Sequence, residues 1–235
     1  MTVEPKDCFF VALDVPTGAA ARALIDRLGT SVSHVKIGHE LMFGGDGVAL
    51  ARELVEAGKQ VFFDAKLLDI GNTVEKSVRN IATLGAAYLT VHATDRKTMD
   101  AAVRGRRDSR LKLLGVTVLT NLDVDDLRDQ KIDADPADLV IHRAQMAKDC
   151  GFDGVIASGQ EAAAIREACG PELLIVTPGI RPTGSDAGDQ SRVMTPAKAI
   201  AAGATHLVVG RPITQAADPA AAARAIAEEI ATALA

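Results

Sequence analysis

The chain alternates between short apolar runs and longer segments in which apolar residues recur about every 3.6 positions. Eight of the apolar runs have the length and the Val, Ile, Leu and Phe content of buried strands. They cover residues 9–15, 34–39, 60–66, 87–93, 112–120, 154–159, 173–179 and 206–211. The segments between them are amphipathic and rich in Ala, so the pattern predicts strands and helices in alternation.

The segment after the third run illustrates the helical pattern. Its apolar positions have helical spacing and are Val74, Val78, Ile81 and Leu84. Asn72 and Glu75 stand three residues apart, which is typical of a capping box at a helix start. Gly85 can end the helix, because glycine readily takes the left-handed backbone found after many helices. We therefore predict a loop over residues 69–73 that passes into a helix at Asn72.

Eight strand–helix units within 235 residues, joined by no long polar linker, favour one fold over two small domains. We predict an α/β protein built as a single-domain (β/α)8 TIM barrel over residues 1–235. An open, doubly wound sheet of eight strands is the alternative that the pattern leaves open. The barrel hypothesis also predicts where functional residues lie. In this fold they gather at the carboxyl ends of the strands.

Composition narrows the class of protein. With 48% hydrophobic residues the chain can bury a large core, and its net charge of -5 with mixed signs argues against nucleic acid as a partner. The first residues lack a signal-peptide pattern, and no apolar run approaches the roughly 18 residues of a membrane span. We expect a soluble, cytoplasmic protein. Cys8, Cys150 and Cys169 have no CxxC spacing, which favours reduced packing residues over disulfides or a zinc site.

Polar and charged residues stand where the predicted strands end. They are Asp14, Lys36, Asp64, Lys66, His92, Thr120 and Arg211. Asp64 and Lys66 are two positions apart, so both side chains leave the same face of a strand and can point into the barrel. A purely structural ion-pair cluster is the alternative, but two acids and two bases at one mouth favour an active site. For His92 we favour a packing or supporting role.

A second group of residues indicates an anionic ligand. The loops after the last two strands of this fold commonly bind phosphate through backbone N–H groups and an Arg. Gly210 and Arg211 follow the eighth strand, and Arg181 lies in a long glycine-containing loop after the seventh, which we expect to be mobile. Taken alone, Arg181 could equally be a solvated loop charge.

Several motifs together resemble one known family. "DAKLLDIGNT" carries a D-x-K-x-x-D pattern, and "ALDV", "VKIG", "GVTVLT", "VTPGIRP" and "VVGRPI" occur in the same order and spacing. In this combination the chain resembles, over nearly its whole length, the orotidine 5'-monophosphate decarboxylase family. The resemblance implies a lyase of de novo pyrimidine biosynthesis that decarboxylates orotidine 5'-monophosphate to uridine 5'-monophosphate with no cofactor and no metal.

The resemblance also implies a role for each site residue. Lys66 is then the proton donor to C6 of the pyrimidine, Asp64 and Lys36 complete a charge network, and Asp69 lies beside the substrate carboxylate. The substrate-binding residues that it implies are Asp14 and Lys36 at the ribose, Thr120, Pro178 and Gln190 at the base, and Arg181, Gln190, Gly210 and Arg211 at the phosphate.

In that family the segment after the third strand serves a neighbouring subunit. The resemblance therefore implies a homodimer with shared active sites, in which Asp69, Ile70 and Thr73 reach the partner. Two rival hypotheses stay open. One is a metal-dependent sugar-phosphate decarboxylase or aldolase of the same superfamily, although an acidic metal ligand typically replaces Lys36 there. The other is a barrel that binds a phosphate ligand without catalysis.

Overall fold

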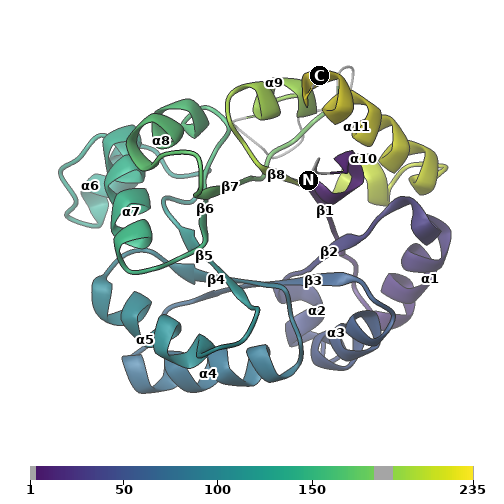
Figure 1. Ribbon diagram of the computed structural model, residues 1–235, viewed down its shortest axis with the longest axis horizontal. Coiled ribbons are helices and arrows are strands. Elements are labelled where there is room, and N and C mark those ends of the chain that lie inside the picture. Colours follow the sequence, from purple (N-terminus) through teal and green to yellow (C-terminus); the bar gives the residue numbers. More distant parts are fainter. Residues whose placement is uncertain (1–3, 183–192, 235) are drawn as a thin grey trace.

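The computed structural model describes residues 4–182 and 193–234, which form a closed barrel of eight parallel strands surrounded by helices (Figure 1). The strands neighbour one another in chain order, and β8 closes the ring on β1. They are β1 (Phe9–Ala12), β2 (His34–Ile37), β3 (Gln60–Leu67), β4 (Tyr88–His92), β5 (Lys112–Val116), β6 (Gly154–Ile156), β7 (Leu174–Thr177) and β8 (His206–Val209). The predicted barrel is confirmed, and the open sheet is excluded.

Helices cover the outside of the barrel and connect its strands. The longer ones are α1 (Gly18–Leu28), α3 (Gly47–Glu56), α4 (Gly71–Thr83), α5 (Arg96–Arg106), α7 (Pro136–Asp149), α8 (Ala162–Cys169) and α11 (Pro219–Leu234). Shorter ones are α2 (His39–Phe43), α6 (Val124–Asp129), α9 (Pro196–Ala201), α10 (Arg211–Thr214) and the 3-10 turns η1 (Pro5–Asp7) and η2 (Gly29–Ser31). The described residues form one domain, and its extent over all of residues 1–235 stays a prediction.

Seven of the eight described strands end earlier than predicted. β1, for example, ends at Ala12 and β5 at Val116, so Asp14 and Thr120 lie in loops beyond the sheet. β3 differs, because it continues to Leu67 and carries Asp64 and Lys66 within the strand itself. The polar residues at the strand ends therefore share one rim, as the barrel hypothesis requires.

The predicted capping box of α4 is wrong. The helix begins at Gly71 after Ile70, which has extended backbone and caps no amide with its side chain. Asn72 and Thr73 therefore lie inside the first turn, and Thr73 is not part of the loop. The carboxylate of Glu75 is bound instead by Arg79 at 2.7 Å and by Arg104 at 3.1 Å. The end of the helix is as predicted, since Gly85 takes a φ of 80° just beyond it.

The barrel interior is closed on its amino-terminal side by an apolar plug. Phe10, Phe62, Tyr88, Leu114 and Val176 form this plug, while the alternate positions pack between strands and helices. In β3, Phe62 points inward and Phe63 outward, so the inward positions of that strand continue toward Asp64 and Lys66. The plug leaves the other half of the interior for polar groups.

Two histidines lie against the plug. The rings of His34 and His206 have their centroids 5.3 Å and 5.5 Å from that of Phe10. Burial lowers the pKa of both imidazoles and brings that of His206 to about 4. His206 is therefore neutral in the folded barrel at neutral pH.

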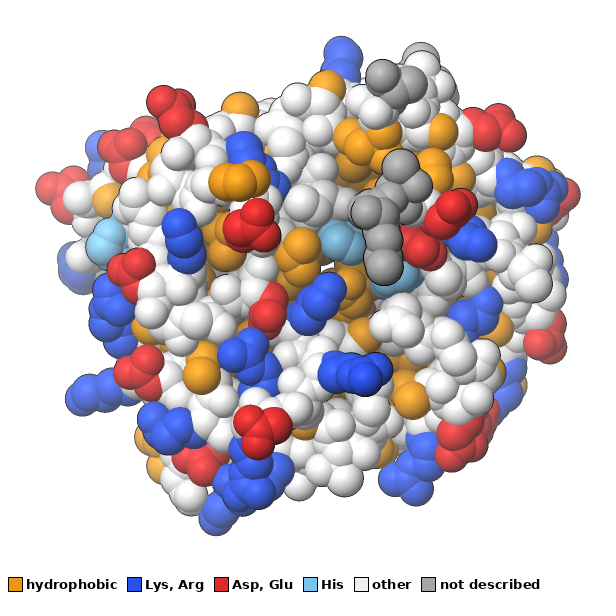
Figure 2. All heavy atoms as spheres, viewed as in Figure 1, with side chains coloured by type: hydrophobic (Ala, Val, Ile, Leu, Met, Phe, Trp, Pro, Cys, Tyr) orange, Lys and Arg blue, Asp and Glu red, His pale blue; other side chains and the backbone are white. Residues whose placement is uncertain are grey.

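The outer surface mixes charges of both signs. On the face seen in Figure 2, Lys and Arg side chains lie among Asp and Glu side chains. None of the helices in the described part of the chain is long and apolar enough to cross a membrane. The three cysteines are free, with Cys8 and Cys169 buried and Cys150 half-buried.

We predict that the free energy of unfolding decreases as the pH falls from about 6.5 toward about 4, because the unfolded chain then takes up a proton at His206 that the folded barrel excludes. The pKa of His206 is lower in the folded protein than in the unfolded chain. Its contribution to the free energy of unfolding is therefore fully present above about pH 6.5 and is lost as the pH falls toward about 4. The loss for this group is about 3 kcal/mol at most. Urea unfolding at several pH values measures it.

His206→Asn keeps a polar group near the position of Nδ1 but cannot be protonated, so its unfolding free energy should depend less on pH. His142→Asn is the matched control, because His142 is exposed on α7. An unchanged pH dependence in His206→Asn would contradict the prediction.

Candidate active site

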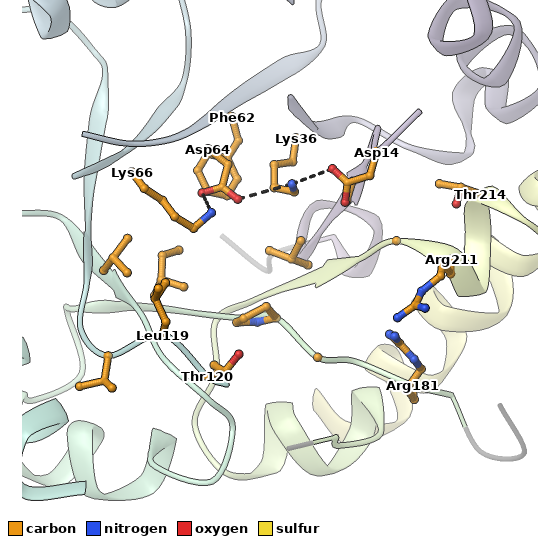
Figure 3. Close-up of a pocket in the computed structure, with 18 of the residues that line it drawn as sticks. Asp14, Lys36, Phe62, Asp64, Lys66, Leu119, Thr120, Arg181, Arg211 and Thr214 are labelled. Atoms are coloured by element: carbon orange, nitrogen blue, oxygen red, sulfur yellow. Dashed lines mark hydrogen bonds and ion pairs between the residues drawn. The ribbon is translucent and has the colours of Figure 1, made fainter. Parts of the chain in front are cut away.

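A cavity of about 530 Å³ opens at the carboxyl ends of the strands (Figure 3). Its lining comes from strands or strand ends around most of the barrel. The polar and charged lining residues are Asp14, Lys36, Asp64, Lys66, Thr120, Arg181, Arg211, Thr214 and Gln215, together with the backbone of Gly179 and Gly210. Most of these were expected from the sequence, so the structure brings the predicted residues to one place.

Four charged side chains form a continuous chain of ion pairs along one wall (Figure 3). Lys36 Nζ lies 3.1 Å from Asp14 Oδ1 and 3.4 Å from Asp64 Oδ2. Lys66 Nζ lies 2.7 Å from the other oxygen of Asp64, Oδ1. The charges thus alternate from Asp14 to Lys66, and each lysine is held by at least one carboxylate.

The carboxylate of Asp64 is ionised despite its burial. Burial alone would raise its pKa, but the charges of Lys36 and Lys66 and hydrogen bonds from Lys66 and Thr90 lower the pKa below its ordinary value. Lys36 is also buried, at 7% exposure, whereas the side chain of Asp14 is 54% exposed. The chain of ion pairs therefore runs from solvent at Asp14 into a desolvated interior at Asp64.

Gly38 permits this close arrangement. A Cβ atom at this position would lie 3.0 Å from Lys36 Nζ and 3.1 Å from Asp14 Oδ1. A larger residue would push apart the pair that orients Lys36.

Lys66 lies on an irregular part of β3. Its φ of 45° is in the left-handed region, and the pairing with β4 shifts register between Phe63 and Leu67. The lining of the cavity also includes the apolar residues Val116, Val118, Leu119 and Ile156, and Leu119 lies on the Lys66 side in Figure 3. The Lys66 ammonium therefore lies in a cavity lined by both charged and apolar side chains.

The opposite end of the cavity is cationic. The guanidinium groups of Arg181 and Arg211 point toward one another there (Figure 3). Arg181 is positioned by backbone pairing with Met194 and by a 2.9 Å hydrogen bond from its Nη1 to the Ile180 carbonyl. Two guanidinium groups facing one space suit a dianion such as a phosphate, which each can bind with two parallel N–H groups.

Three expected site residues lie outside the cavity lining. Asp69, Ile70 and Thr73 are exposed, and Ile70 is 74% exposed although it is apolar. Asp69 Oδ1 accepts a 2.6 Å hydrogen bond from the amide of Ile70. Gln190 lies outside the described residues. His92 is partly buried beside the cavity and does not line it, and burial lowers its pKa.

Sequence reasoning missed several lining residues. Thr214 and Gln215 stand one helical turn after Arg211, a spacing that could have indicated them. The apolar residues of β5 and β6 gave no such signal, because inward and outward apolar positions look alike in a strand buried on both faces.

No cluster of three or more His, Cys, Asp or Glu side chains suited to a metal ion occurs within residues 4–182 and 193–234. Lys36 bridges the exposed carboxylate of Asp14 and the buried carboxylate of Asp64. The arrangement can therefore hold an elongated anionic ligand between the arginine pair and Lys66.

Comparison with known proteins points to one family. Residues 8–226 match the model of the family described as orotidine 5'-phosphate decarboxylase / HUMPS. The chain is 55% identical over 228 residues to the orotidine 5'-phosphate decarboxylase of Rhodopseudomonas palustris (strain HaA2), covering 97% of this chain and 96% of the relative. It is equally similar, at 55% over 232 residues, to that of Methylobacterium sp. (strain 4-46), covering 97% and 98%.

Solved structures show the same likeness. The crystal structure of orotidine 5'-phosphate decarboxylase from Lactobacillus acidophilus superposes with a TM-score of 0.84 at 37% identity, over 94% of this chain and 98% of that one. The enzyme of the same name from Pyrococcus horikoshii OT3 gives a TM-score of 0.76 at 28% identity, over 95% and 99%.

Proposed function

This chain belongs to the orotidine 5'-phosphate decarboxylase / HUMPS family, and we propose that it converts orotidine 5'-monophosphate to uridine 5'-monophosphate with Lys66 as the proton donor. The carboxy-lyase activity is the one for which its relatives at 55% identity are named, and it places the chain in pyrimidine biosynthesis. The observation that carries the mechanism is the ion pair between Lys66 and the buried Asp64, 2.7 Å apart, at the inner end of the cavity.

The reaction needs strong electrostatic stabilisation. The bond between C6 and the carboxylate breaks, carbon dioxide leaves, and the electron pair stays on C6 in an orbital that the ring carbonyls cannot delocalise. The Lys66 ammonium counters this charge and then gives its proton to C6, which forms the new C6–H bond and leaves a neutral amine. Proton donation alone contributes about 10²- to 10⁴-fold, so a preorganised field of fixed charges must supply most of the remaining acceleration.

Lys36 and Asp64 supply that field. Asp64 holds the Lys66 ammonium in place through an ion pair, while Lys36 balances the second oxygen of Asp64. Because these charges are already paired and oriented before the ligand binds, little reorganisation is needed during the reaction. Lys36 also lies between Asp14 and Asp64. A divalent cation bound by these two carboxylates would need the space that the Lys36 ammonium occupies and would be repelled by its charge. This supports a reaction with no metal and no cofactor.

The rest of the cavity binds the nucleotide. Arg181, Arg211 and the backbone of Gly210 take the phosphate, with Gln190 contributing from outside the described residues. Asp14 and Lys36 bind the ribose hydroxyls, while Thr120, Pro178 and Gln190 border the base. Binding energy at the phosphate end holds the reacting carbon near Lys66.

The active site is completed by a second subunit. The apolar side chains of Ile70 and Phe43 are 74% and 83% exposed, which suits an interface better than solvent. In a homodimer with shared sites, Asp69, Ile70 and Thr73 reach the partner's cavity, and Asp69 lies beside the substrate carboxylate. The homodimer works in the cytoplasm.

We predict that the purified protein consumes orotidine 5'-monophosphate at the same rate with and without a chelator, as followed by ultraviolet absorbance. Loss of activity with the chelator would favour metal-dependent chemistry. Binding of uridine 5'-monophosphate without any turnover would instead favour a non-catalytic barrel.

Lys66→Ala should abolish measurable turnover, because it removes both the proton and the charge opposite C6. Binding of uridine 5'-monophosphate, measured by calorimetry, should largely survive, since the arginine pair is untouched. Lys97→Ala is the control, because Lys97 is exposed on α5. Turnover near the wild-type rate in Lys66→Ala would refute the proton-donor role.

The same variant tests the shared site. Lys66→Ala and Asp69→Asn should each be inactive alone. When equal amounts of the two variants exchange subunits at random, about a quarter of all shared sites receive Lys66 from one subunit and Asp69 from the other. Activity should return to about that level after mixing and subunit exchange. No recovery, with exchange verified by mass spectrometry, would show that each subunit builds its own site.

Arg211→Ala should raise the Michaelis constant for orotidine 5'-monophosphate about 10- to 100-fold, because it removes a charged hydrogen-bond donor from the phosphate. With orotidine, which lacks the phosphate, the variant and the wild type should react alike. Arg110→Ala is the control, since Arg110 is exposed away from the cavity. An equal loss on both substrates would contradict a phosphate role.

A further inference from the structure

The peptide that joins Ala65 to Lys66 does not take part in the regular barrel ladder. β3 advances from Phe63 to Leu67 while β4 advances only from Leu89 to Val91, so extra residues of β3 are accommodated between the two paired positions. Lys66 takes a φ of 45°, a conformation that residues with a side chain rarely adopt. Such a backbone persists only where its surroundings hold it, and the barrel ladder does not hold it here.

Two side chains bind this one peptide. The hydroxyl oxygen Oγ1 of Thr90 accepts a 2.9 Å hydrogen bond from the Lys66 amide, and His39 Nε2 lies 3.0 Å from the Ala65 carbonyl oxygen. These contacts satisfy the donor and the acceptor that the irregular strand leaves without ladder partners. The backbone conformation of Lys66 is therefore set by side chains from β4 and α2.

The Thr90 hydroxyl has a second contact that links the backbone to the ion pair. It donates a 3.0 Å hydrogen bond to Asp64 Oδ1, the same oxygen that lies 2.7 Å from Lys66 Nζ. Thr90 is fully buried at 0% exposure and does not line the cavity, so it does not touch a ligand there. One hydroxyl thus joins the backbone that carries the ammonium to the carboxylate that holds it.

We propose that Thr90 is a positioning residue of the reaction, whose hydroxyl sets the Lys66 backbone and the Asp64 carboxylate in fixed relation to each other. The inference rests on the proposed function, because the proposed function assigns proton transfer to the Lys66 ammonium. Only a side chain that accepts and donates at once can make both contacts. Serine keeps this capacity, whereas valine has nearly the shape of threonine and lacks it.

The test compares Thr90→Val with Thr90→Ser. Thr90→Val should lower kcat for orotidine 5'-monophosphate about 10- to 100-fold, because a misplacement near 1 Å of a catalytic group has effects of this size. Its Michaelis constant and its affinity for uridine 5'-monophosphate should stay within about 3-fold, since the phosphate end is unchanged. Thr90→Ser should retain kcat within about 3-fold. Rates are expressed per binding-competent site, counted by nucleotide titration.

Thr117→Val is the matched control. Thr117 is buried at 1% exposure beyond the end of β5, and its hydroxyl donates to the Ile156 carbonyl rather than to a charged group. This variant should keep the wild-type kcat. If Thr90→Val yields too little folded protein, Thr90→Ala, which adds no bulk, should show the same selective loss of kcat.

The outcomes separate this proposal from the proposed function. Wild-type turnover together with an unchanged kcat in Thr90→Val would overturn the positioning role alone. A loss in Thr90→Ser as large as in Thr90→Val, or an equal loss in Thr117→Val, would also overturn it, because packing would then explain the effect. Absence of turnover in the wild type would instead overturn the proposed function.

Discussion

A buried carboxylate that has to remain charged is the constraint on which the site depends. Asp64 lies at the inner end of the cavity, where burial disfavours its ionised form, and it stays ionised because Lys36, Lys66 and Thr90 all contact it. Removing any one of these partners leaves a buried charge less compensated, which is far more costly than losing a surface ion pair. The barrel supplies the partners from β2, β3 and β4, three neighbouring strands whose ends converge on one rim.

The same constraint explains why the barrel interior is divided. Near the amino-terminal ends of the strands it is filled by Phe10, Phe62 and Tyr88, and burial lowers the pKa of the two histidines beside them. Near the carboxyl ends the inward positions of β2 and β3 change from ring systems to Lys36, Asp64 and Lys66. The apolar half gives rigidity to the strands, and rigid strands fix the distances between charges that the polar half requires.

Much of this arrangement could be predicted from the sequence. The apolar runs gave all eight strands because a parallel sheet buried on both faces leaves continuous Val, Ile, Leu and Phe segments. The cavity residues at strand ends followed from the fold, and their roles remain proposals. The capping box at Asn72 was wrong because the helix begins one residue before it, and the left-handed Lys66 was not foreseen. In that conformation the Lys66 amide donates a hydrogen bond to Thr90, 24 positions away, a contact that no local pattern encodes.

The apolar plug affects how the two reaction products leave the barrel. Phe10, Phe62 and Tyr88 fill the amino-terminal end of the barrel interior, and the cavity lies at the carboxyl ends of the strands. In a decarboxylase built this way, carbon dioxide is released at the closed end while the nucleotide is still held between it and the arginine pair. The gas has to pass the nucleotide or wait for it to depart, so the architecture of the barrel couples the exit of one product to that of the other.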